Sequence, residues 1–250
     1  MRLIKITSSL KLLVLLAVIV LLPGISYAAW IESPTGWIGN WGGPGTTVTY
    51  SFATTNYVID NYTAPTNAYS TSGVAQVVPE AWKPALATAF DTWSASCGLN
   101  FVEVADSGQA WNTDGAAGDI RIALTEVDPS GVLAYGYMPT GPVSAWGDIH
   151  FDSTWDWYVG SGAPGASQID LISVAVHELG HAIGVVHNDD PTSVMSPTYT
   201  IGTVERDLGV PETDLVQLQY GESTPEPATM LLLCLSLGAG YFMSSPSDDD

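Results

Sequence analysis

The chain has 250 residues, of which 26 are acidic and only 6 are basic, so its formal net charge is −20 at pH 7. Such an acidic surface repels nucleic acid and anionic membranes, so we expect neither to bind the acidic body of the chain. The length and the 9 tryptophans indicate one sizeable hydrophobic core, and we expect a single-domain monomer. The two cysteines, Cys97 and Cys234, are too few for a disulfide framework.

The first 28 residues have the organisation of a secretory signal peptide. A basic start precedes an apolar run from Leu12 to Leu22, and Ser26-Tyr27-Ala28 supplies a small-residue cleavage site. The alternative is an N-terminal membrane anchor, which the short apolar run disfavours. We therefore expect an exported protein, extracellular or associated with the cell envelope, whose mature domain spans residues 29–222.

The body of the chain contains both predicted strands and predicted helices. Runs of β-branched and apolar residues, bounded by Gly, Asp or Asn, predict strands at 46–52, 101–104 and 119–124. Residues 81–97 carry apolar side chains at helical spacing, which predicts an amphipathic helix covering a sheet. Two more helices are expected at 170–183 and 213–220.

The segment from His177 to His187 has the pattern H-E-x-x-H-x-x-G-x-x-H. On a helix, His177 and His181 project from one face toward one metal ion. Gly184 lets the helix stop sharply, so the chain can turn back and supply His187 as a third ligand. Three protein ligands leave a fourth position open for water, which is typical of a catalytic zinc ion. The carboxylate of Glu178, beside the first ligand, can accept a proton from that water.

A shorter pattern of two histidines and one glutamate also arises by chance, in a partly buried helix whose histidines are hydrogen-bonded. The longer pattern uses three of the four histidines in the chain. We therefore favour a zinc site.

The full motif resembles that of the metzincin metallopeptidases. The stretch Ser193-Val194-Met195-Ser196-Pro197-Thr198-Tyr199 follows it and favours the matrixin branch. The resemblance implies that Met195 lies in a turn under the metal, and that Pro197 and Tyr199 form a wall of the primed-side substrate pocket. It also implies that residues 132–137, including Leu133 and Ala134, form an edge strand that pairs with extended substrate.

The resemblance covers about residues 45–222 and implies an α+β metzincin fold. A twisted mixed sheet, a covering helix and the active-site helix would be followed by a small C-terminal lobe with the Met-turn. The implied function is zinc-dependent endopeptidase activity on extracellular proteins, with Glu178 activating the zinc-bound water. One departure is Asn188, where matrixins usually have serine.

A second, structural zinc ion is not expected. Matrixins bind it through three histidines and an aspartate, whereas here only His150 remains and Tyr135 replaces the edge-strand histidine. We interpret His150 as a packing or hydrogen-bonding residue. Calcium is a candidate second metal, because Asp152 matches the calcium-ligand position of the family and Asp156 is close to it. A solvated acidic loop explains these two aspartates equally well.

Residues 223–250 resemble the PEP-CTERM sorting segment of bacterial exported proteins. Pro225-Glu226-Pro227 precedes an apolar stretch at 228–243, which as a helix would span about 24 Å of a roughly 30 Å bilayer core. We therefore expect a transient membrane association through this helix. The resembling segments end in arginines, whereas this chain ends in three aspartates.

The main alternative function is a catalytically inactive metzincin-fold binding protein of an extracellular matrix. It would contact polysaccharide through tryptophans such as Trp37, Trp41 and Trp111. Glu178 argues against this alternative, because a non-catalytic scaffold needs no base beside an open metal site. A calcium-stabilised structural or adhesion protein is a third alternative, and only the acidic charge supports it.

Overall fold

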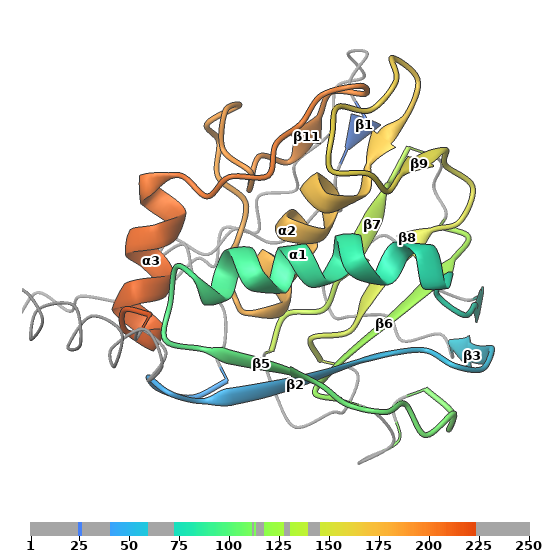
Figure 1. Ribbon diagram of the computed structural model, residues 1–250, viewed down its shortest axis with the longest axis horizontal. Helices are drawn as coiled ribbons and strands as arrows, with labels where there is room; N and C mark the ends of the chain where they lie inside the picture. Colours follow the sequence, from blue (N-terminus) through green and yellow to red (C-terminus); the bar gives the residue numbers. More distant parts are fainter. Residues whose placement is uncertain are drawn as a thin grey trace, which may run out of the picture.

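The computed structural model describes the backbone of residues 25–26 and all atoms of the ranges 41–59, 73–111, 113, 118–127, 131–139 and 146–223. Most of the predicted signal peptide and the predicted sorting segment from residue 224 onward lie outside these residues. At the centre is a five-stranded sheet of order β5-β2-β6-β8-β7, with α1 and α2 packed together on one face (Figure 1).

The central sheet is mixed, as predicted. Its strands are β2 (Thr47–Phe52), β5 (Asn100–Glu103), β6 (Ile120–Thr125), β7 (Ala134–Gly136) and β8 (Ile149–Asp152). All neighbouring strands are parallel except β7, which runs antiparallel to β8. The predicted edge strand at 132–137 is shorter than expected, but it does lie at the end of the sheet. Within the described residues, β8 is the one strand that pairs with it.

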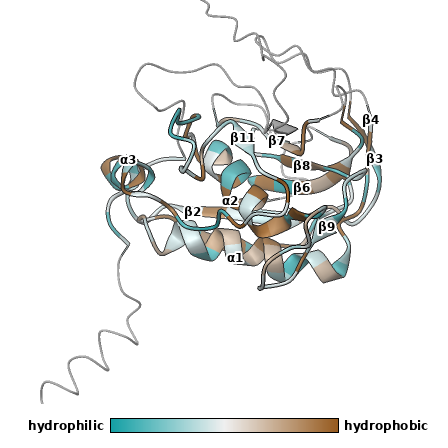
Figure 2. Ribbon diagram, turned by 90° about the horizontal axis from the view of Figure 1, so that it is seen from above, coloured by the Kyte–Doolittle hydropathy of each residue, from teal (hydrophilic) through white to brown (hydrophobic). Residues whose placement is uncertain are grey.

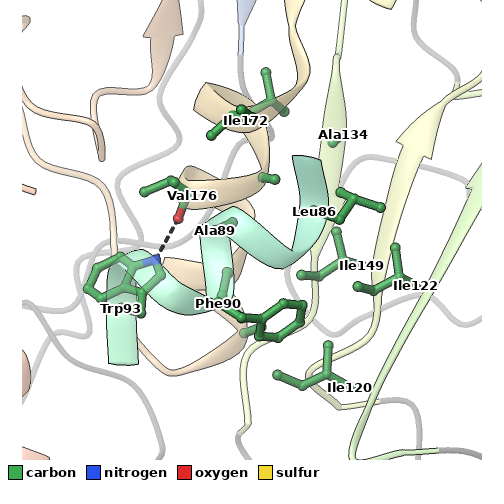
Figure 3. Packing of buried hydrophobic residues seen from close by; sticks show 14 of the residues in the cluster. Leu86, Ala89, Phe90, Trp93, Ile120, Ile122, Ala134, Ile149, Ile172 and Val176 are labelled. Carbon is green, nitrogen blue, oxygen red and sulfur yellow. Dashed lines mark hydrogen bonds between the residues drawn. The ribbon is translucent and has the colours of Figure 1, made fainter. Parts of the chain in front are cut away.

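Three α-helices complete the domain: α1 (Lys83–Ser94), which follows the 3₁₀ turn η1 (Glu80–Trp82), α2 (Leu171–Ala182) and α3 (Val210–Tyr220). The predicted helix at 81–97 is confirmed, but it is shorter than predicted at both ends. Its apolar side packs between the sheet and α2, and Figure 3 shows Phe90 facing the sheet isoleucines and Trp93 facing α2. The indole nitrogen of Trp93 donates to the carbonyl oxygen of Val176 at 2.9 Å, which fixes α1 against α2.

The opposite face of the sheet is covered by a hairpin that the sequence did not predict. It consists of β3 (Tyr57–Ile59) and β4 (Gly73–Ala75), and it continues into a bridge between Gln76 and Leu124 of β6. Tyr57, Ile59 and Ala75 form a second apolar cluster with Ala123 and Tyr135. This second layer is why every residue of β6 is buried, and Figure 2 shows hydrophobic colouring along β6 and β8.

Two short strand pairs flank α2. Strand β9 (Trp157–Tyr158) pairs in parallel with β10 (Ile169–Asp170), which leads directly into the helix. Strand β1 (Ile25–Ser26) pairs antiparallel with β11 (Thr198–Tyr199). None of the helices in the described part of the chain combines the length and apolarity needed to cross a membrane.

Candidate active site

Helix α2 carries the central part of the motif, and both of its ends are defined by the sequence. At the start, the Asp170 side chain accepts a hydrogen bond from the backbone N–H of Ser173 at 3.0 Å and caps the helix. At the end, Gly184 has φ of +102°, a left-handed conformation that glycine adopts without strain. The predicted sharp stop is therefore present, and the chain turns back toward the helix.

The turn brings the three predicted zinc ligands together. His181 Nε2 lies 3.0 Å from His177 Nε2 and 3.2 Å from His187 Nε2. Tetrahedral zinc with Zn–N bonds of 2.0–2.1 Å needs ligand nitrogens about 3.3 Å apart. Among the described residues, these histidines form the one group of three or more metal-binding side chains whose ligand atoms converge.

The hydrogen bonds of the imidazoles show which nitrogen faces the centre of the group. His177 Nδ1 lies 2.7 Å from the Val194 carbonyl oxygen, and His181 Nδ1 lies 2.8 Å from that of Val185. Because a carbonyl oxygen only accepts, each Nδ1 carries the proton and each Nε2 presents a lone pair. Lone pairs this close repel one another unless a cation binds between them, so the donor set fits zinc.

Electrostatics agrees with a ligand role. Burial lowers the pKa of His177 and His181 well below the usual value, and the neighbouring histidines lower it further. Burial also lowers the pKa of His187 to about 4. All three imidazoles are therefore neutral near pH 7, which is the form that binds metal.

Glu178 follows the first ligand and is fully buried. Burial raises its pKa to about 8, and the backbone amide of Gly136 opposes this shift. Within the described part of the chain, no side chain donates a hydrogen bond to its carboxylate. A nearby cation would lower the pKa again, so the group can act as a base once the histidines hold a metal.

Gly136 of the edge strand is a site residue that sequence reasoning missed. A Cβ atom at this position would lie 2.8 Å from the Glu178 carbonyl oxygen and 3.4 Å from its Oε2. The first distance is too short for any side chain. Glycine therefore lets the edge strand approach α2 closely.

Met195 lies against α2, next to the ligands. It is fully buried, and a Cβ atom at Gly180 would meet its Sδ at 2.5 Å. Its neighbour Val194 supplies the carbonyl that orients His177. The segment around Met195 thus packs against the helix and also holds one ligand in position.

Helix α3 fixes the loop that joins the third ligand to Met195. The buried carboxylate of Glu212 accepts hydrogen bonds from Ser193 Oγ and from Asn188 Nδ2 at 3.1 Å. Asn188, the residue that departs from the matrixin pattern, therefore has a structural role directly after His187.

The predicted substrate residues lie on two segments. Leu133 and Ala134 are fully buried, main chain included. Tyr199 is also buried, and its hydroxyl donates to the Thr203 carbonyl oxygen and accepts from the Asp170 N–H at 3.1 Å. Pro197 is half-buried two residues earlier. The structure thus links the predicted pocket wall to the start of α2.

The two aspartates predicted for calcium do not converge with a third acidic group in the described residues. Asp152 is buried and accepts a hydrogen bond from the Thr154 N–H at 2.9 Å. Asp156 is exposed, and its carboxylate accepts a hydrogen bond from Gln168. A calcium site here would need backbone carbonyl or water ligands as well.

His150 has the packing and hydrogen-bonding role that the sequence suggested. Its Nε2 lies 3.1 Å from the Tyr57 hydroxyl, and its ring stacks on Tyr135 with centroids 5.1 Å apart. Both tyrosines belong to the cluster on the far face of the sheet.

Comparisons with known proteins agree with this geometry. Residues 49–221 match the family Peptidase_M10, described as Matrixin. The chain is 34% identical over 180 residues to human matrix metalloproteinase-16, which covers 64% of this chain and 28% of that protein. The rat protein of the same name is 33% identical over 180 residues, with the same coverage. Human matrix metalloproteinase-20 is 34% identical over 124 residues, covering 46% of this chain and 22% of that protein. The chain thus spans less than a third of the length of these relatives.

Proposed function

Since the chain belongs to the matrixin family, we propose that it is an exported zinc endopeptidase that cleaves extracellular proteins, with Glu178 as the general base. The observation that carries the proposal is the convergence of three Nε2 atoms beside a buried carboxylate. Zinc bound there would polarise the scissile carbonyl and lower the pKa of a water molecule. His177, His181 and His187 would hold it and leave one position open.

Glu178 would perform the proton transfers. It would take a proton from the attacking water and deliver it to the leaving amine. Its burial keeps bulk water away from the carboxylate, and the absence of a side-chain partner leaves its oxygens available to a water molecule. An inactive binding protein would have no use for a buried carboxylate without a side-chain partner, because such a group costs stability.

Extended polypeptide would bind along the outer side of β7 through main-chain hydrogen bonds. Gly136 brings this strand against Glu178, so a substrate paired to β7 would pass close to the base. Pro197 and Tyr199 would contact its primed side. The antiparallel pairing of β1 with Thr198–Tyr199 supports this assignment, because the same backbone can accept an extended strand.

The remaining predictions concern location and calcium. Residues 1–28 would direct export, and the segment from 223 would hold the protein briefly at the membrane before release. Asp152 and Asp156 would contribute to a calcium site near β8. The enzyme would act as a monomer.

The decisive test is Glu178→Gln in the mature domain. Zinc content should stay at the wild-type level because the carboxylate is not a ligand, whereas hydrolysis of a denatured protein should fall by about 10²–10⁴-fold. Glu80→Gln, at an exposed acidic residue, is the matched control and should keep full activity. If Glu178→Gln retained near wild-type turnover with full zinc, the mechanism would be wrong. If zinc-loaded wild type hydrolysed no denatured protein, the inactive binding protein would be favoured.

A further inference from the structure

Arg206 makes an unusually dense set of contacts at the start of the catalytic helix. Its Nε lies 2.8 Å from Asp170 Oδ2 and its Nη2 lies 2.6 Å from Asp170 Oδ1. The same guanidinium donates to the carbonyl oxygens of residues 160, 161 and 162 at 3.0, 2.7 and 2.9 Å. This one side chain therefore connects the segment after Tyr199, the loop after β9, and the N-terminus of α2.

The partner carboxylate belongs to the residue that caps α2. Asp170 is fully buried and also accepts a hydrogen bond from Ser173 Oγ at 2.6 Å. Ser173 Oγ in turn accepts from the backbone N–H of Glu205 at 2.7 Å. The segment before Arg206 is held in the same way, because the Gly202 N–H donates to the Gln168 carbonyl oxygen at 3.0 Å.

Tyr199 joins this network, since its hydroxyl bridges the Asp170 N–H and the Thr203 carbonyl oxygen. The position of Tyr199 relative to α2 thus depends on the contacts that fix residues 199–206. Helix α2 carries His177 and Glu178, so the network links the pocket wall to the catalytic groups. Within the described part of the chain, Arg206 is one of three lysine or arginine residues.

We propose that Arg206 is a positioning residue that sets the side-chain selectivity of the enzyme, by holding the segment from Tyr199 to Arg206 at a fixed distance from α2. The inference rests on the proposed peptidase function and on Tyr199 contacting the primed side of the substrate. It requires arginine rather than lysine. A guanidinium presents five donors in a planar fork, whereas an ammonium group has three and cannot bind a carboxylate bidentately.

The chain offers a matched control in Arg121. Its Nε and Nη2 lie 2.6 and 3.0 Å from the two carboxylate oxygens of Asp106, whose side chain has no exposed surface, and its Nη1 donates to a carbonyl oxygen at 3.0 Å. The bidentate pairing with a carboxylate is therefore the same as at Arg206. Arg121 stacks over Tyr57 on the far face of the sheet, away from the catalytic helix.

The test compares Arg206→Lys with Arg121→Lys in the zinc-loaded mature domain. Both variants keep a positive charge beside the buried carboxylate, so both should fold. The substrates are peptides that differ only in the size of the first side chain after the scissile bond. For Arg206→Lys, the ratio of kcat/KM between a large and a small side chain should change at least about tenfold, mainly through KM. For Arg121→Lys the ratio should remain that of wild type. An unchanged ratio in Arg206→Lys would overturn the inference.

Hydrogen exchange of the same proteins provides a readout that does not depend on turnover. The amides of Gly202 and Glu205 should exchange faster in Arg206→Lys, but not in Arg121→Lys, because their bonds to Gln168 and Ser173 are held by the Arg206 network. Unchanged exchange at both amides would refute the positioning role, whether or not the enzyme cleaves peptides. If exchange accelerated but wild type cleaved no peptide, the positioning role would stand and the peptidase proposal would fail.

Discussion

Replacement of Gly180 by alanine tests the packing under the zinc ligands. A methyl group at this position would lie 2.5 Å from Met195 Sδ, 2.9 Å from Met195 Cε and 2.9 Å from Trp93 Cζ2. Both neighbours are fully buried, and the bond to the Val176 carbonyl oxygen fixes the indole of Trp93. The methyl group therefore has no space unless Met195 moves.

The expected size of the effect follows from two opposing contributions. Overpacking a tight core costs about 1–3 kcal/mol, whereas alanine in a helix gains up to about 1 kcal/mol over glycine. The steric contribution should dominate because two neighbours are contacted at once. We expect a net loss of about 1–2 kcal/mol, which lowers Tm by about 2–8 °C in a domain of this size. Zinc affinity should fall as well, because Val194 beside Met195 orients His177.

Thermal unfolding of the zinc-loaded domain measures this effect, with Gly43→Ala as the control. A Cβ atom at Gly43 would have no other atom within 4 Å, so its Tm should stay near wild type. In a Met195→Ala background, the cost of Gly180→Ala should shrink, since the clashing side chain is gone. The reasoning is refuted if Gly180→Ala melts at or above the temperature of Gly43→Ala, or if the cost is the same in both backgrounds.

Three further predictions concern protons and metals. Burial, followed by the charge of Arg121, lowers the pKa of His150 to about 3. Between about pH 6.5 and pH 3, the His150 imidazole is therefore protonated in the unfolded chain but neutral in the native state. The free energy of unfolding should therefore fall on acidification. Between pH 7.5 and pH 5, urea titrations should show that wild type loses about 2 kcal/mol more of this free energy than His150→Gln does. Equal losses in the two proteins would contradict the prediction. Elemental analysis after dialysis should find one zinc ion per chain in wild type and in His150→Gln but none in His187→Ala; two tightly held zinc ions would disprove the single site. Added calcium should raise the Tm of wild type but not of Asp152→Asn, and a Tm independent of calcium would remove that site.

The parts of the structure that sequence could predict are those determined by local spacing. The separation of His177 and His181 places both on one helix face, and Gly184 determines where the chain turns back, so the convergence of the ligands follows from eleven consecutive residues. The helix at 81–97 and the strands were recognisable for the same reason. Their ends differ from the predicted ones by a few residues, because the last turn of an element depends on tertiary contacts.

The features that were not predicted depend on residues far apart in the chain. The hairpin of β3 and β4 has strands of three residues each, and such short strands carry no detectable periodicity. Gly136 looks like any strand glycine until α2 is placed beside it. Arg206 and Asp170 are 36 positions apart, and no sequence pattern distinguishes an arginine that will be half enclosed from one that stays in solvent.

The far face of the central sheet has a consequence for how the protein is made. Tyr57, His150 and Tyr135 close that face with side chains of the chain itself. Assembly of the sheet can therefore precede the acquisition of zinc, which concerns only the groups around α2. With the export proposed above, the chain would fold in surroundings poor in zinc and gain activity later, at the place where the metal is supplied. Zinc availability would then control when and where cleavage begins, and bound zinc would add to the stability of the folded domain.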